Sequence, residues 1–135
     1  MGLLEWKESY SVGVRLLDIQ HRQLLDIINQ VAAARDANLT EKFFFTTLNL
    51  LVKYADIHFS TEEKYMREQG YPGLAEHEEE HRKFTENVFA LRESLEGKNP
   101  SIFPEIQTFL RDWYISHVLG TDRGYISFFA QKGIT

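Results

Sequence analysis

The sequence predicts an all-α protein: an antiparallel up-down-up-down four-helix bundle with an irregular N-terminal arm and a short C-terminal helical tail. Apolar residues recur every three or four positions in four long segments, which is the spacing of one helix face. No segment shows the two-residue alternation of a strand, and the connections between segments are short, which favours antiparallel neighbours. The chain of 135 residues is expected to form a single domain, residues 1–135.

The arm covers residues 1 to about 17, and two helices follow it. The first is expected from about Asp18 to Asp36, and its apolar stripe comprises Leu24, Leu25, Ile28, Val31 and Ala32, together with His21. The second is expected to begin after Thr40, acting as N-cap, and to end near Gln69, where Gly70 and Pro72 follow. Its stripe comprises Leu48, Leu51, Val52, Ala55 and Phe59, together with His58 and Glu62.

The third helix, from about Gly73 to Glu96, has the clearest register. Its inward positions alternate steps of four and three: His77, His81, Phe84, Val88, Leu91 and Leu95. The three glutamates at positions 78–80 are expected mostly to face solvent. The fourth helix is expected to begin near Ser101, and its stripe comprises Ile106, Phe109, Leu110, Trp113 and His117.

The composition excludes several classes of function. The net charge of −5 and the absence of clustered Lys and Arg argue against a nucleic-acid partner. There is no cysteine, so disulfides and thiolate metal sites are excluded. No stretch approaches the roughly 20 apolar residues of a membrane span, and the N-terminus does not resemble a signal peptide. We therefore expect a cytoplasmic protein without membrane insertion.

All five histidines lie on predicted apolar faces. A single histidine in such a place is more often a core residue with an ordinary partner than a metal ligand. Five unpartnered imidazoles, however, would cost about 1–3 kcal/mol each, against a net stability of about 5–15 kcal/mol for a small domain. The five together therefore indicate a shared centre that coordinates them.

Two acidic residues extend this set. Glu62 follows His58 by four residues, so both project from one face, and a buried carboxylate needs a cation. Asp122 follows His117 by five residues, about 140° around an ideal helix, and an exposed N-cap is an equally good interpretation from spacing alone. Five imidazoles and two carboxylates match two metal ions, and their chemistry suits iron, zinc or manganese.

The motifs that carry these residues resemble the hemerythrin family, in its bacterial branch. They are WKESYSVGV with DIQH ending at His21, HFSTE from His58 to Glu62, EEKYMREQGYPGLAEH extending through His81, and WYISHVLGTD from Trp113 to Asp122. The order H…HxxxE…HxxxH…HxxxxD places all seven ligand types on four successive predicted helices. The resemblance implies reversible dioxygen binding at a non-haem di-iron centre, in a protein that carries, stores or delivers oxygen and is not an enzyme.

The resemblance also implies a role for each ligand. His77, His81 and His117 would hold one iron, and His21 and His58 the other. An oxo or hydroxo group, Glu62 and Asp122 would bridge the two ions. The iron with two histidines would keep an open position for oxygen. Because Asp122 would then face inward, we expect the fourth helix to widen or break between His117 and Asp122, with Gly120 as the weak point.

Six further residues are expected around the centre. Leu24, Phe59 and Val118 would form an apolar wall at the open position. By family position, Tyr125 would hydrogen-bond a bridging carboxylate and Trp113 would pack over the site, although both also suit an ordinary aromatic core. Tyr114 stands where the family usually has an aliphatic residue, and we expect it to obstruct oxygen access or to donate a hydrogen bond to bound oxygen.

Three other functions remain open. The first is an oxygen or redox sensor, which would act through a separate partner, whereas an oxygen carrier could deliver to an oxygen-consuming enzyme. A ferritin-like di-iron oxidase or peroxidase typically has Glu-x-x-His on two helices, whereas residues 78–81 form the one such motif in this chain. A bundle without metal would leave the histidines unexplained.

Overall fold

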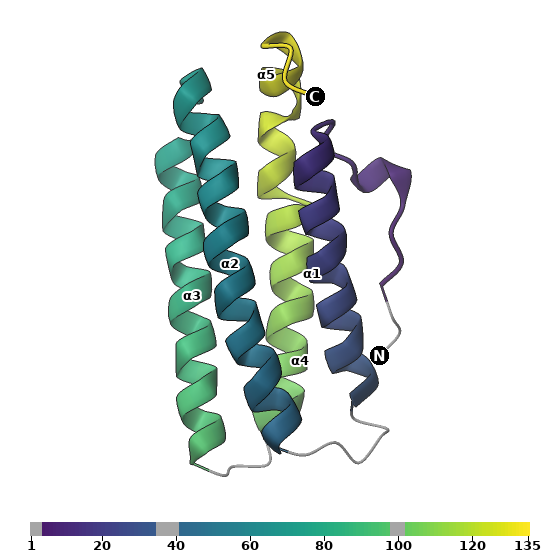
Figure 1. The fold of residues 1–135 in the computed structure, drawn as a ribbon, viewed down its shortest axis with the longest axis vertical. Coiled ribbons are helices and arrows are strands. Elements are labelled where there is room, and N and C mark those ends of the chain that lie inside the picture. Colours follow the sequence, from purple (N-terminus) through teal and green to yellow (C-terminus); the bar gives the residue numbers. More distant parts are fainter. Residues whose placement is uncertain (1–3, 35–40, 98–101) are drawn as a thin grey trace.

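The computed structural model describes residues 4–34, 41–97 and 102–135. Four long helices run side by side and alternate in direction: α1 (Arg15–Ala34), α2 (Glu41–Gln69), α3 (Leu74–Glu96) and α4 (Ile102–Trp113) (Figure 1). A single turn, η1 (Glu8–Tyr10), lies in the N-terminal arm, and α5 (Ile126–Gln131) forms the C-terminal tail. The predicted four-helix bundle is confirmed.

The ends of the helices agree with the sequence to within a few residues. Helix α1 begins at Arg15, three residues before the predicted start, because Val14 already accepts a hydrogen bond from the Asp18 amide. Helix α2 ends at Gln69, and Gly70 follows with a φ of 71°, a conformation that favours glycine. The predicted N-cap Thr40, the end of the first helix at Asp36 and the predicted start at Ser101 lie outside the described residues.

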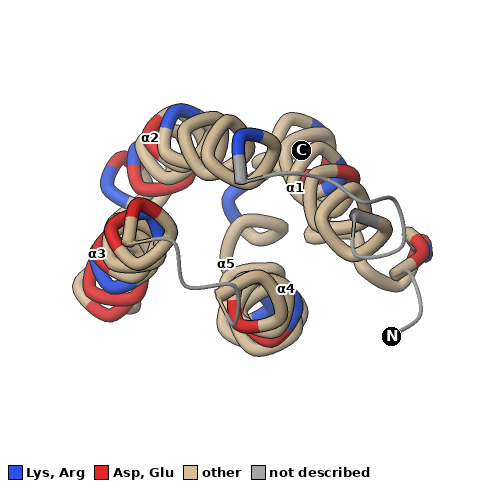
Figure 2. The backbone as a smooth tube through the Cα atoms, turned by 90° about the horizontal axis from the view of Figure 1, so that it is seen from below, with Lys and Arg blue, Asp and Glu red and all other residues tan. Residues whose placement is uncertain are grey.

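The core lies along the axis that the four helices enclose. Helix α2 packs against both α1 and α3, and α4 packs against α1 and α3. Seen along the bundle, the helices surround a common interior, and charged residues are prominent on α3 (Figure 2). Buried apolar side chains fill this interior from all four helices. A smaller cluster, which includes Val12, Leu17, Met66, Tyr125 and Phe129, closes the end nearest the C-terminus.

No helix in the described part of the chain combines the length and the apolar character needed to cross a bilayer.

Candidate metal centre

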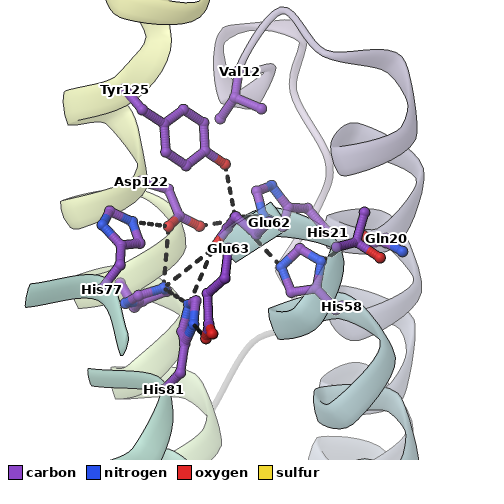
Figure 3. A network of polar contacts seen from close by, with 12 residues as sticks. Val12, Gln20, His21, His58, Glu62, Glu63, His77, His81, Asp122 and Tyr125 are labelled. Atoms are coloured by element: carbon purple, nitrogen blue, oxygen red, sulfur yellow. Dashed lines mark hydrogen bonds and ion pairs between the residues drawn. The ribbon is translucent and has the colours of Figure 1, made fainter. Parts of the chain in front are cut away.

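The seven residues predicted as metal ligands converge inside the bundle, and ion-pair distances of 2.9–3.6 Å connect each of them to another member of the set. Figure 3 labels all of them except His117. Each has at most 3% of its side chain exposed. They come from α1, α2, α3, the segment after α4 and the turn that follows it. Their side chains are His21, His58, Glu62, His77, His81, His117 and Asp122.

Glu62 directs its two carboxylate oxygens toward two different groups of histidines. Its Oε1 lies 3.0 Å from His81 Nε2 and 4.0 Å from His117 Nε2. Its Oε2 lies 3.5 Å from His21 Nε2 and 3.6 Å from His58 Nε2. One carboxylate therefore faces imidazole nitrogens on both sides.

The two carboxylate oxygens of Asp122 likewise face different groups of histidines. Its Oδ1 lies 2.9 Å from His77 Nε2 and 3.1 Å from His117 Nε2, whereas Oδ2 lies 3.2 Å from His21 Nε2. The three-histidine group (His77, His81 and His117) and the two-histidine group (His21 and His58) are thus joined by two carboxylates. This is the arrangement of donors that a pair of cations requires.

The unsatisfied polar atoms at the centre support a fit to metal ions. His21 Nε2, His58 Nε2, Glu62 Oε1 and Asp122 Oδ2 are buried without a hydrogen-bond partner, although they lie close to one another. Each such atom costs about 1–3 kcal/mol when nothing binds it. A cation between them would remove this cost.

His81 and His117 give a second test of the fit. Their Nε2 atoms lie 3.2 Å apart, and their Nδ1 atoms face the carboxylates of Glu63 and Glu80, at 2.7 and 2.9 Å. Since a carboxylate accepts, each Nδ1 donates, so any of these rings without a second proton presents an Nε2 lone pair to the other ring. Either a proton or a metal ion must lie between them.

The carboxylates of Glu62 and Asp122 influence the charge of the histidines. Burial lowers the pKa of His21 and His117, but the adjacent carboxylates of Asp122 and Glu62 outweigh this and raise the pKa values to about 9 and about 11. Burial lowers the pKa of His58 to about 4. Without metal, therefore, His21 and His117 hold protons at neutral pH, and His58 is neutral.

Metal loading should therefore release protons. An imidazole must be deprotonated to bind a metal, and below pH 9 both His21 and His117 carry a proton that the metal displaces. The affinity should rise with pH by about tenfold per unit for each proton released, and fall in acid. Titration of Zn²⁺ into the metal-free protein at pH 7 in weak buffer measures this, and His21→Gln should release one proton fewer. An equal release from both proteins would contradict the assignment.

The chain after α4 departs from regular helix at the predicted place. A π-helical turn, η2 (Tyr114–Val118), is followed by Gly120 with φ −123° and ψ −85°, and by the 3₁₀ turn η3 (Thr121–Tyr125). The amide of Leu119 donates to the carbonyl of Tyr114, five residues earlier, which widens the turn. The predicted widening is confirmed, and it begins before His117, earlier than expected. It brings Asp122 onto the inner face.

Aromatic residues pack directly on the histidines. The Tyr125 hydroxyl donates to Glu62 Oε2 at 2.8 Å, and Trp113 stacks on His117 with ring centroids 4.5 Å apart. Phe59 stacks on His81 at 3.9 Å and also lies 5.7 Å from His58, so it contacts both histidine groups. All three therefore adjoin the centre.

The remaining predicted pocket residues are buried as well. Leu24, Tyr114 and Val118 have at most 1% exposure. The Tyr114 hydroxyl donates to the backbone carbonyl of His21 at 3.3 Å. Because this hydroxyl already has an acceptor, the structure favours an effect of Tyr114 through its bulk over hydrogen bonding to a ligand.

The sequence analysis missed the residues that hold the histidine rings. Gln20 Oε1 lies 2.6 Å from His58 Nδ1, and Glu63 and Glu80 fill this role for His81 and His117. Glu80 was expected to face solvent with its neighbours, but it reaches from α3 to His117 and also accepts from the Thr121 hydroxyl at 3.0 Å. Adjacency in sequence to a ligand is the signal that all three share.

Comparison with known proteins decides the family. The domain described as "Hemerythrin HHE cation binding domain" matches residues 12–129. The chain belongs to the hemerythrin family. Together with the cluster of histidines and carboxylates, this membership confirms the expected cofactor, a di-iron centre.

Individual hemerythrin relatives cover nearly all of the chain. The bacteriohemerythrin of Stenotrophomonas maltophilia is 30% identical over 93% of this chain and 80% of its own length. That of Methylococcus capsulatus is 28% identical over 93% and 95%. A wild-type hemerythrin crystal structure superposes with a TM-score of 0.80 at 26% identity, over 92% of this chain and 95% of its own. The crystal structure of a hemerythrin variant with a leucine-to-tyrosine substitution superposes with a TM-score of 0.81 at 27% identity, over 93% of this chain and 95% of its own.

Proposed function

We propose that this protein binds dioxygen reversibly at a di-iron centre and acts as an oxygen carrier, store or delivery protein. The single observation that supports this function best concerns Glu62 and Asp122. In each residue, one carboxylate oxygen faces the three-histidine group and the other faces the two-histidine group. His77, His81 and His117 would hold one ion and His21 and His58 the other. When bound, the iron pair supplies electrons that dioxygen takes up on binding and returns on release.

The chain's own residues suit reversible binding. The group with two histidines offers one ligand fewer, so a metal ion held there would keep a coordination position open. The side chains of Leu24 and Val118 are buried and apolar, and an apolar, water-free wall disfavours the protonation that leads to irreversible oxidation. Tyr125 holds Glu62 by its hydroxyl and so limits the movement of a bridging ligand.

Cycling the reduced, iron-loaded protein between air and argon tests this function. We expect a visible absorption band that forms in air and disappears on sparging over repeated cycles. Permanent oxidation in the first cycle, with single-turnover product formation from an added reductant, would indicate an oxidase or peroxidase instead. A reversible band that appears together with regulated binding to a separate protein would favour the sensor, and contradict a carrier role.

Tyr114 should limit the rate at which oxygen reaches the centre. Its fully buried ring belongs to the apolar core, and its hydroxyl contacts the carbonyl of a proposed ligand, His21. Tyr114→Leu removes ring volume and should speed oxygen binding several-fold in stopped-flow measurements. Tyr114→Phe keeps the bulk and should bind oxygen at nearly the parent's rate. An oxygen-binding rate in Tyr114→Leu equal to the parent's would contradict this role.

A further inference from the structure

The two histidine groups differ in what accepts their outer N–H bonds. On the three-histidine side, His81 donates to Glu63 at 2.7 Å and His117 donates to Glu80 at 2.9 Å. Both acceptors are carboxylates, and they are 21% and 31% exposed at the edge of the core. Two of the three histidines there therefore have an anionic acceptor.

On the two-histidine side, no carboxylate of the described residues accepts from an outer N–H bond. His58 Nδ1 meets the side-chain oxygen of Gln20 at 2.6 Å, and among the described residues His21 Nδ1 has no hydrogen-bond partner. Gln20 is itself held in place, since the Tyr54 hydroxyl donates to its backbone carbonyl and the Tyr54 ring stacks on His58. The acceptor on this side is thus neutral and fixed.

This difference has an electrostatic consequence for a bound metal. A carboxylate that accepts from a ligating imidazole draws its proton outward and makes the ring a stronger donor to the metal. Charge-assisted hydrogen bonds are about twice as strong as neutral ones, so an amide has a smaller effect. A stronger donor stabilises the more highly charged ion, which means the ferric over the ferrous state.

We infer that Glu63 and Glu80 make the two iron positions electronically unequal, with the lower reduction potential at the ion held by His77, His81 and His117. Glu63 and Glu80 act through the histidines, so they are positioning residues and do not contact the reacting atoms. The inference rests on the ligand assignment of the proposed function. The ion away from the open position would then be the more readily oxidised of the two, and so the one suited to supply the second electron.

Four single substitutions, Glu63→Gln, Glu80→Gln, Glu79→Gln and Gln20→Glu, separate this effect from a general change of charge. Glu63→Gln keeps the shape and an acceptor oxygen but removes the charge beside His81. Glu79→Gln is the control: it also removes one negative charge, but from a residue on α3 that pairs with Arg82. Gln20→Glu is the reciprocal change, because it adds a carboxylate beside His58.

The experiment measures both one-electron couples by spectroelectrochemical titration, together with the Zn²⁺ affinity of the metal-free proteins. Glu63→Gln should raise one couple by about 59 mV, a tenfold shift of the ferric/ferrous ratio, and weaken Zn²⁺ binding about tenfold. Glu80→Gln should act in the same direction, and Gln20→Glu should lower the other couple. Glu79→Gln should leave both couples near the parent's values.

Equal shifts in Glu63→Gln and Glu79→Gln would overturn the inference, because they would reflect only the overall charge. Unchanged couples in Glu63→Gln and Glu80→Gln, in a parent that binds two irons and dioxygen, would overturn the inference and leave the proposed function intact. A parent that binds fewer than two irons would instead overturn the proposed function.

Discussion

Glu62→Gln is expected to lower the iron content from two ions per chain to at most one. Glu62 is completely buried, and its two oxygens face histidines from both groups at 3.0–3.6 Å. An amide keeps the shape but cannot offer two anionic oxygens, so one side of the centre loses its bridging ligand. The ordinary hydrogen bond from Tyr125 can persist, which limits the damage to the metal-free fold.

The loss should appear both in metal analysis and in thermal unfolding. A ligand present at 1,000 times its Kd stabilises the folded state by about 4 kcal/mol, and most of this gain should disappear from the variant in the presence of iron. Glu68→Gln is the matched control, since Glu68 lies on the same helix but is exposed and pairs with Lys64. Two retained irons and a reversible oxygen band in Glu62→Gln would exclude a bridging role.

Gly120→Ala is expected to displace Asp122 and to destabilise the protein by about 1–3 kcal/mol. A Cβ at this position would lie 2.3 Å from the carbonyl oxygen of Ser116, a backbone atom that cannot rotate away. The turn between His117 and Asp122 must then open, and it carries Asp122 with it. The variant should bind less iron and melt at a lower temperature.

Gly97→Ala provides the comparison for this substitution. Gly97 follows α3, and a Cβ there would lie 3.3 Å from the Ser94 carbonyl oxygen, so a shift of a few tenths of an ångström accommodates it. Iron content should equal the parent's. Full iron occupancy in Gly120→Ala would show that Asp122 does not depend on the turn at Gly120.

Much of the fold could be predicted because helical periodicity is a local property. The alternating register of α3 placed His77 and His81 on the same face as Phe84 and Val88, and both histidines are buried. Gly70 marks the end of α2 through its positive φ, and Gly97 follows the end of α3. These features depend on the spacing of residues along one chain segment.

The widening of the fourth helix required additional information. From spacing alone, Asp122 could be either a metal ligand or an exposed N-cap, and the resemblance to a family favoured the inward position. The structure shows that the irregularity begins at Tyr114, because the carbonyl of Tyr114 accepts the π-helical hydrogen bond from the Leu119 amide. A periodic pattern cannot locate such a shift, since one wider turn changes the direction of every side chain after it.

The sequence by itself determined the helices, their inward faces and the presence of five histidines with two acids on those faces. Only the tertiary structure decided which oxygen of Glu62 and Asp122 faces which histidine, and that Gln20, Glu63 and Glu80 hold the rings. Periodicity sets the direction of a side chain about its own helix axis. Distances between helices depend on how the helices cross, how far they slide along one another and which rotamers the packed core allows.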